Sequence, residues 1–130
     1  MAKYVWYSAL LLLVLTACAQ PRDIEPSQAK EMLNNKERLG LFVLNVHTPY
    51  EGKLEKTDAI IEDWGNVAAH QDQLPKDKNA PILVYCRTGR MSSSAVKQLK
   101  ELGYSNIYHL KGGMKAYDAA GYEVMEKSWK

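Results

Sequence analysis

An apolar run in the second half of the chain ends in a cysteine, and a helical pattern follows almost at once. Pro81-Ile82-Leu83-Val84-Tyr85 is typical of a buried strand, and Cys86 comes directly after it. From Ser92 to Leu102 apolar residues recur at helical spacing, and Gly103 stands where a helix would end. A strand joined to a helix by a short loop is the repeating unit of α/β folds, so the pattern predicts parallel strands.

The rest of the chain repeats this alternation of short apolar runs and helical patterns. We predict further strands over 41–46, 59–61 and 107–110, and helices beginning at Ser27 as N-cap, over 66–74 and over 114–120. Residues 47–58 are polar, which predicts a loop. The expected fold is therefore α/β, with a central parallel sheet covered by helices on both faces.

The first eighteen residues have the pattern of an export signal. Lys3 precedes an apolar run over 5–15, which is shorter than the roughly 20 residues that a membrane-spanning helix needs. The run ends in Leu15-Thr16-Ala17-Cys18, which resembles the lipobox of bacterial lipoproteins. The resemblance implies that 1–17 is a signal peptide and that Cys18 is acylated, for example with palmitate. An uncleaved hydrophobic anchor and a plain signal peptide with a chance cysteine are the alternatives.

This export pattern sets the expected organisation and location of the mature chain. We expect a lipidated tether over 18–26, a domain over 27–124 and a C-terminal tail over 125–130. The lipid would hold the protein on the cell envelope of a bacterium, with the domain in the periplasm. In a bacterium with two membranes, Ala19 after the lipid cysteine resembles the sorting pattern for the outer membrane. The net charge of +2 gives no reason to expect a nucleic-acid partner.

Cys86 would then be the only free thiol, and its neighbours favour a nucleophile. Two cysteines and three histidines are too few for a disulfide scaffold or a convincing metal site. Between a strand and a helix, loop amides without internal partners form a concavity that binds anions. Arg87 and Arg90 would add positive charge there and stabilise the thiolate. A buried core cysteine is the alternative, but it would not explain the two arginines and Gly89.

Three segments resemble the rhodanese-like single-domain sulfurtransferases. Cys86-Arg87-Thr88-Gly89-Arg90-Met91-Ser92 resembles their active-site loop, C-R-x-G-x-R-S. Leu44-Asn45-Val46-His47-Thr48-Pro49-Tyr50-Glu51 resembles their D-V-R-x-P-x-E stretch, and Leu110-Lys111-Gly112-Gly113-Met114-Lys115-Ala116-Tyr117 resembles L-x-G-G-W-x-A-W. Together the likeness covers about residues 24–124, nearly the whole expected domain.

The resemblance implies a persulfide relay without a metal or an organic cofactor. Cys86 would take a sulfane sulfur from thiosulfate or a similar small anionic donor and pass it to a thiol or to cyanide. The substrate-binding residues would be those of the loop, namely Arg87, Thr88, Gly89, Arg90, Met91 and Ser92. The expected protein is a monomer whose only membrane contact is the lipid at Cys18.

The chain departs from the family pattern in three places. Asn45 and His47 stand where the family usually has Asp and Arg, which removes a buried ion pair or replaces it with a neutral contact. Residues 53–59 replace the usual G-H-I-P-G-A segment, and Met91 replaces the second loop arginine. These changes affect the expected substrate preference more than the sulfur chemistry. All three histidines are expected to be structural or at the surface, with His47 the least certain.

Two other functions compete with sulfur transfer. Phosphatases of related fold use a C-x5-R loop, but the residue six positions after Cys86 is Ser92, so the phosphate-binding arginine is missing. A non-catalytic sulfur-carrier, redox-sensing or interaction module on the envelope is the stronger alternative. Retention of the cysteine with both loop arginines favours the enzyme.

Overall fold

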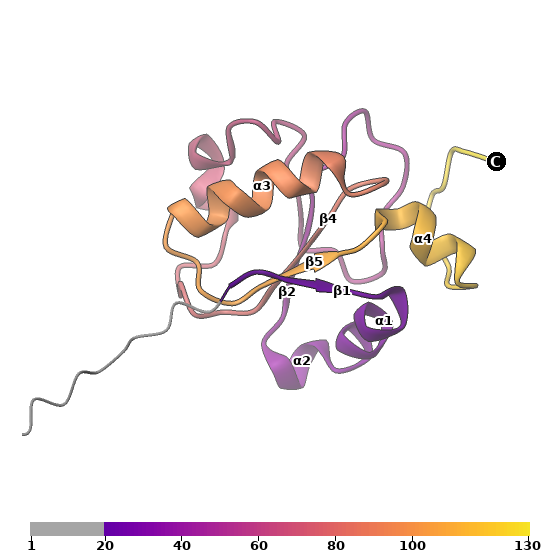
Figure 1. The fold of residues 1–130 in the computed structure, drawn as a ribbon, viewed down its shortest axis with the longest axis horizontal. Helices are drawn as coiled ribbons and strands as arrows, with labels where there is room; N and C mark the ends of the chain where they lie inside the picture. Colours follow the sequence, from indigo (N-terminus) through magenta and orange to yellow (C-terminus); the bar gives the residue numbers. More distant parts are fainter. Residues whose placement is uncertain (1–19) are drawn as a thin grey trace, which may run out of the picture.

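The computed structural model describes residues 20–130 and contains one parallel sheet with helices on both sides (Figure 1). The elements in chain order are β1 (Arg22–Ile24), α1 (Pro26–Asn34), α2 (Lys36–Leu39), β2 (Phe42–Asn45), β3 (Ala59–Ile60), η1 (Val67–Gln73), β4 (Ile82–Tyr85), α3 (Arg90–Glu101), β5 (Ile107–Leu110) and α4 (Gly113–Ala119). The strand order is β1-β5-β4-β2-β3, and every pair is parallel. The predicted α/β fold with a central parallel sheet is confirmed.

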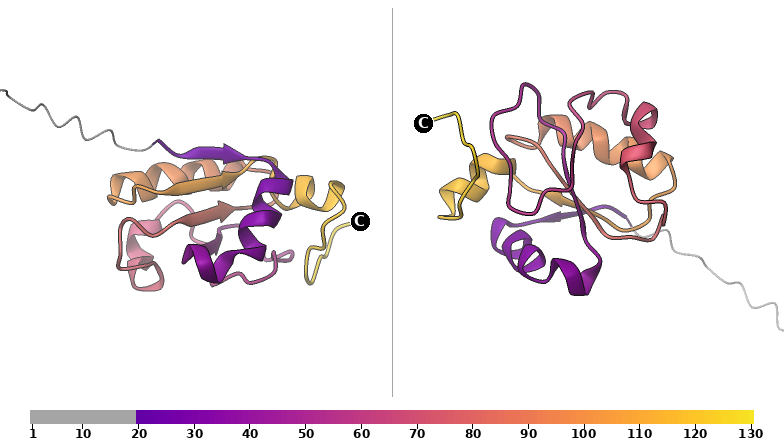
Figure 2. Two further views of the ribbon diagram at one scale, coloured as in Figure 1. Left: turned by 90° about the horizontal axis from the view of Figure 1, so that it is seen from below. Right: turned by 180° about the vertical axis from the view of Figure 1, so that it is seen from behind.

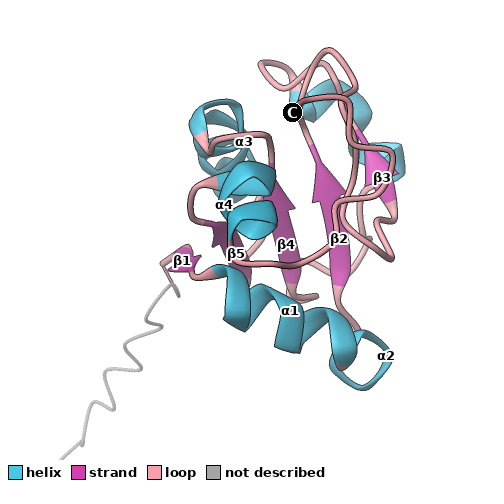
Figure 3. Cartoon of the chain, turned by 90° about the vertical axis from the view of Figure 1, so that its right-hand side faces the viewer, coloured by secondary structure: helices cyan, strands magenta, loops and turns pink. Residues whose placement is uncertain are grey.

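Strand β4 shows how the two faces of the sheet are packed. Successive side chains of a strand point to opposite faces. Ile82 and Val84 accordingly join the apolar cluster beneath α3 and η1, whereas Leu83 and Tyr85 join the cluster beneath α1 and α4. All four are fully buried, as expected for a central parallel strand. In Figure 1 α3 lies above the sheet and α1 and α2 lie below it, and Figure 3 shows β2 and β4 as upright arrows with α1 and α2 at their lower end.

Two predicted helix starts were wrong by two residues each. The N-cap of α1 is Glu25 instead of Ser27, because Glu25 and Gln28 form a reciprocal capping box and Pro26 takes the first helical position. Helix α3 begins at Arg90 instead of Ser92, since the positive φ of Gly89 ends the loop and allows the helix to start at once.

The segment predicted as a lipidated tether, 18–26, is not a tether throughout. Residues 22–24 form β1, which pairs with β5 in the register Asp23 to His109, so the domain begins before residue 27. Only Ile24 of this strand is buried, which is why apolar patterning did not reveal it. The predicted signal peptide 1–17 and the predicted lipidation residue Cys18 lie outside the described residues.

The predicted tail, 125–130, is also attached to the domain. Met125 forms an antiparallel bridge with Lys53, and the Ser128 amide donates to the Glu51 carbonyl at 3.1 Å. The right-hand view of Figure 2 shows the C-terminal end beside α4 and the long loop after β2. These segments meet at the carboxyl edge of the sheet, where Cys86 also lies, and this edge is where open α/β sheets bind ligands.

Within residues 20–130 no helix combines the length and the apolar content needed to cross a bilayer.

Candidate functional site

The sulfur of Cys86 lies at the end of β4, beneath the first turn of α3. The Gly89 amide donates a hydrogen bond to Sγ at 3.0 Å, and the Ser92 hydroxyl lies 3.2 Å from the same atom. Cys86 is only 1% exposed, so its sulfur is held by these donors more than by water. Gly89 has a φ of +104°, a conformation that side-chain-bearing residues adopt only at a cost. The loop therefore offers a sulfur anion two donors at the N-terminus of a twelve-residue helix.

The N-terminus of α4 holds this loop from the other side. The Met114 amide donates to the Cys86 carbonyl at 2.9 Å, and the Lys115 amide donates to the Arg87 carbonyl at 2.9 Å. Gly113 approaches so closely that a Cβ there would lie 2.5 Å from the Arg87 carbonyl oxygen. Gly113 of the Gly-Gly segment is thus a packing requirement of the cysteine loop, because only hydrogen fits between the two backbones.

The two loop arginines have different surroundings. Arg87 Nη1 lies 3.4 Å from Glu51 Oε2, and its guanidinium lies 5.6 Å from the ring centroid of Trp129. Its Nε is buried, and no acceptor in residues 20–130 bonds to it. Arg90 is exposed at the first position of α3, and Thr88 is exposed between them. The positive charge expected near Cys86 is present, but Arg87 is partly neutralised by Glu51.

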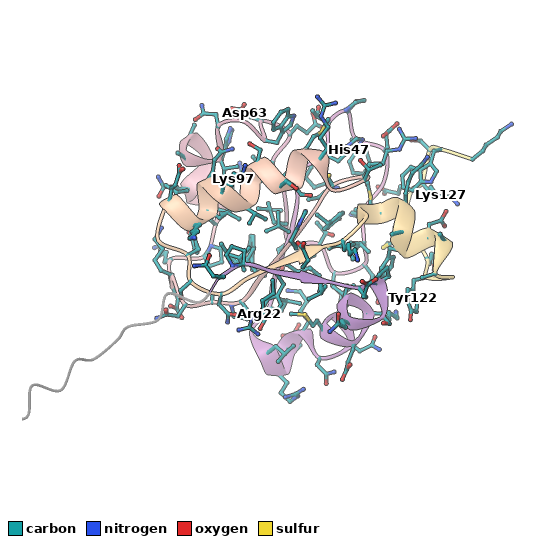
Figure 4. The ribbon with its side chains drawn as sticks, in the orientation of Figure 1. Arg22, His47, Asp63, Lys97, Tyr122 and Lys127 are labelled. Atoms are coloured by element: carbon teal, nitrogen blue, oxygen red, sulfur yellow. The ribbon has the colours of Figure 1, made fainter. Side chains whose placement is uncertain are left out.

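Asn45 and His47, which stand where the family usually has Asp and Arg, hydrogen-bond to the backbone and to a carboxylate, respectively. The side-chain amide of Asn45 donates to the Gly52 carbonyl at 3.1 Å, and its Oδ1 accepts from the backbone N–H of His47 at 2.9 Å. The imidazole of His47 contacts the carboxylate of Glu51, which also faces Arg87. Figure 4 places His47 near the start of α3, at the same end of the molecule as Lys127 of the C-terminal segment. Asn45 is fully buried, so it orders the loop after β2 without carrying charge.

The two remaining predicted loop residues, Met91 and Ser92, have different environments. Met91 is half-buried and packs against the apolar cluster beneath α3. Ser92 is fully buried and contacts the sulfur. The loop residues that the structure brings to the Cys86 sulfur are therefore Gly89 and Ser92.

A chain of polar contacts behind Ser92 was missed by the sequence reasoning. Ser92 Oγ lies 2.6 Å from Nε2 of His109 on β5, and His109 Nδ1 lies 3.0 Å from Asp23 Oδ1 on β1. The expectation for His109 was a structural or surface role, yet its side chain is 12% exposed and two contacts from the sulfur. Only the unpredicted strand β1, in register with β5, brings Asp23 to it.

A surface hollow lies elsewhere, at the β3 edge of the sheet. It is lined by Lys53, Thr57, Asp58, Ala59, Ile60 and Gln73. None of these residues belongs to the cysteine loop, and the hollow holds no nucleophilic thiol. The chemistry of the site argues for the Cys86 edge instead, because there a buried nucleophile, donors and positive charge converge.

Comparisons with known proteins agree with this choice. The family model described as "Rhodanese-like domain" matches residues 25–120. A thiosulfate sulfurtransferase GlpE of Ectopseudomonas mendocina is 30% identical over 98 residues, which cover 75% of this chain and 85% of that protein. A tRNA uridine(34) hydroxylase of Bartonella bacilliformis is 43% identical over 62 residues, but these cover 48% of this chain and only 19% of that protein.

Solved structures support the fold. A rhodanese-related protein from Thermoplasma volcanium superposes with a TM-score of 0.65 at 24% identity, and the match covers 82% of this chain and 99% of that one. At this identity the likeness bears on the architecture, and it agrees with the parallel sheet described above.

Proposed function

Because the chain belongs to the rhodanese-like domain family, we propose that it is a sulfurtransferase that carries a sulfane sulfur as a persulfide on Cys86. The observation that carries this proposal is the pair of donors, the Gly89 amide and the Ser92 hydroxyl, aimed at one buried sulfur. The similarity to a thiosulfate sulfurtransferase over most of both chains supports the same type of chemistry. The hydroxylation named for the Bartonella relative is not carried over, since this chain spans 19% of that protein.

In the first half-reaction, the Cys86 thiolate attacks the outer sulfur of thiosulfate or a similar donor. A bond forms between Sγ and that sulfur, the sulfur–sulfur bond of thiosulfate breaks, and sulfite leaves with its electron pair. The negative charge then resides on the outer sulfur of the persulfide. Donors that are fixed in advance around a developing anion cost no reorganisation when the charge forms, so the loop would stabilise this intermediate.

The donor would be recognised by charge at the rim of the loop. Thiosulfate is a dianion, and Arg90 is an exposed cation on the first turn of α3. The Nε of Arg87 is a buried donor to which no acceptor within 20–130 is bonded. Both groups would attract an anionic donor. The carboxylate of Glu51 would weaken this attraction, because it already pairs with Arg87.

In the second half-reaction, a thiolate or cyanide attacks the outer sulfur of the persulfide. The Sγ–S bond breaks, its electron pair returns to Sγ, and the Cys86 thiolate is regenerated. The products are a persulfide of the acceptor thiol, or thiocyanate when cyanide is the acceptor. Sulfur is transferred without net oxidation of the protein.

The test is the mass of the full chain after treatment with thiosulfate. We expect a gain of about one sulfur atom that is lost on adding cyanide or a thiol. Cys86→Ser should abolish the gain, while the matched variant Cys18→Ser should retain it. An unchanged mass in the parent protein would refute the proposal. A gain that neither acceptor removes would instead identify a non-catalytic sulfur carrier.

We also propose that Cys18 is lipidated and that the domain is held on the envelope of a bacterium, facing the periplasm. The support is the lipobox-like Leu15-Thr16-Ala17-Cys18 after a short apolar run. Metabolic labelling with palmitate should mark the parent protein and the Cys86→Ala variant equally, and Cys18→Ala should lose the label. Label that persists in Cys18→Ala would overturn the assignment.

A further inference from the structure

We propose that Asp23, His109 and Ser92 form a proton relay that converts the Cys86 thiol to its nucleophilic thiolate. Ser92 contacts the sulfur directly, whereas His109 and Asp23 are positioning residues that act through it. The inference rests on the proposed function, because an ionised Cys86 is what the first sulfur transfer requires.

The relay is continuous from the buried sulfur to the protein surface. Its contacts are Cys86 Sγ to Ser92 Oγ at 3.2 Å, Ser92 Oγ to His109 Nε2 at 2.6 Å, and His109 Nδ1 to Asp23 Oδ1 at 3.0 Å. Cys86 and Ser92 are buried, whereas the His109 side chain is 12% exposed and that of Asp23 is 70% exposed. A proton leaving the sulfur therefore has a hydrogen-bonded route out of the core.

The hydroxyl of Ser92 sits between two acceptors but carries a single proton. Because the Asp23 carboxylate accepts a hydrogen bond only from a protonated Nδ1, neutral His109 presents an unprotonated Nε2 to Ser92. Two arrangements then satisfy every contact. In one, the Cys86 thiol donates to Oγ and the hydroxyl donates to Nε2. In the other, protonated Nε2 donates to Oγ and the hydroxyl donates to the thiolate.

Passing between these arrangements moves one proton from sulfur to imidazole. The Sγ–H bond breaks as an Oγ–H bond forms, and the previous Oγ–H bond breaks as an Nε2–H bond forms. Cys86 becomes negative and His109 positive, with no change in oxidation state. The carboxylate of Asp23 stabilises the imidazolium by direct contact, and the Gly89 amide stabilises the thiolate.

The charged groups on the surrounding elements do not oppose a negative Cys86 beside a positive His109. On β1, Arg22 is directed to the Tyr108 hydroxyl at 3.3 Å. After β5, Lys111 pairs with Glu25. On the loop, Arg87 faces Glu51, and Arg90 is exposed on α3. Within residues 20–130, Asp23 is the only charged side chain paired with the His109 ring. The ring also packs against Gly89: a Cβ added to Gly89 would lie 3.8 Å from His109 Cε1.

The test is the rate at which iodoacetamide alkylates Cys86 in the full chain, measured across pH by peptide mapping that separates Cys86 from Cys18. His109→Gln should slow alkylation about tenfold near neutral pH, and the loss should vanish at alkaline pH, where the thiol ionises unaided. The control is His70→Gln, because His70 pairs with Asp63 at 3.1 Å and, within residues 20–130, makes no hydrogen bond to Cys86. It should match the parent protein at every pH. An unchanged rate in His109→Gln, or a loss that is equal at all pH values, would overturn the relay.

A second variant guards against misfolding of His109→Gln. Asp23 is exposed at the sheet edge, so Asp23→Asn should keep the urea midpoint of the parent protein and shift the alkylation profile in the same direction by a smaller factor, about two- to threefold. No shift in this variant would remove Asp23 from the relay. Alkylation needs no sulfur donor, so the relay and the proposed function fail separately. An altered alkylation profile without any sulfur uptake from thiosulfate would refute the proposed function alone.

Discussion

Replacing Gly113 with alanine would place a methyl group inside the backbone of the cysteine loop. The added Cβ would lie 2.5 Å from the carbonyl carbon and oxygen of Arg87 and 2.6 Å from the carbonyl oxygen of Cys86. Neither contact is with a flexible side chain, so the start of α4 and the loop must move apart. That movement would break the hydrogen bonds from Met114 and Lys115 to the same two carbonyls.

The expected loss of stability follows from three costs. A left-handed backbone, here with φ at +63°, costs an alanine about 1–2 kcal/mol. Inserting a methyl group into packed surroundings costs about 1–3 kcal/mol. Each lost backbone hydrogen bond costs about 1 kcal/mol. We therefore expect Gly113→Ala to lower the free energy of unfolding by about 4–7 kcal/mol, a large part of the stability of an ordinary domain.

Gly40→Ala is the matched control, because it isolates the backbone cost. Gly40 has a φ of +62°, and nothing lies within 4 Å of the position of its Cβ. Urea unfolding should show a loss of only about 1–2 kcal/mol for this variant. Sulfur uptake by Cys86, measured under conditions where both variants are folded, should fall in Gly113→Ala alone. Equal losses of stability in the two variants would refute the proposed packing between α4 and the loop.

Three further variants test the charges and the buried tyrosine. Glu51→Gln should lower the KM for thiosulfate about two- to fivefold in steady-state assays, because Arg87 loses its partner, and an unchanged or raised KM would contradict this. Arg90→Gln should raise that KM and leave the urea midpoint unchanged, since Arg90 is exposed. An unchanged KM with a lowered urea midpoint would show that Arg90 has a structural role instead. Burial raises the pKa of Tyr85, so the contribution of Tyr85 to stability should be constant below about pH 10 and fall above it. In urea unfolding, Tyr85→Phe should reduce this alkaline fall, and an equal fall would exclude Tyr85 as its source.

Apolar patterning predicted four of the five strands, β2 to β5, and most clearly the central strand β4, which is buried on both faces. Residues 107–110 were predicted as a strand and form β5, and 81–85 contains β4. Such strands are continuous apolar runs, which can be recognised without knowing their partners. Strand β1 has two exposed residues out of three, so its formation depends on pairing with β5. Local sequence carries no signal of that pairing.

The same distinction applies to the site. Gly89 and Ser92 are within six residues of Cys86, and the strand–loop–helix pattern was enough to predict a cradle around the sulfur. Asp23 and His109 are separated by 86 residues and meet only through the register of two strands. A histidine at the surface end of a strand looks the same in sequence whether or not a carboxylate pairs with it. Predicting this pair would have required predicting β1 first.

The direction of β1 also relates the two cysteines. All strands are parallel, so the start of β1 at Arg22 lies at the edge of the sheet opposite to Cys86 (Figure 1). In the proposed lipoprotein, Cys18 precedes Arg22 by four residues, and an extended chain of that length spans at most about 14 Å. The lipid would therefore hold the domain close to the membrane by the amino edge of its sheet. The cysteine loop at the carboxyl edge would then face away from the bilayer, which leaves it open to soluble sulfur donors and acceptors.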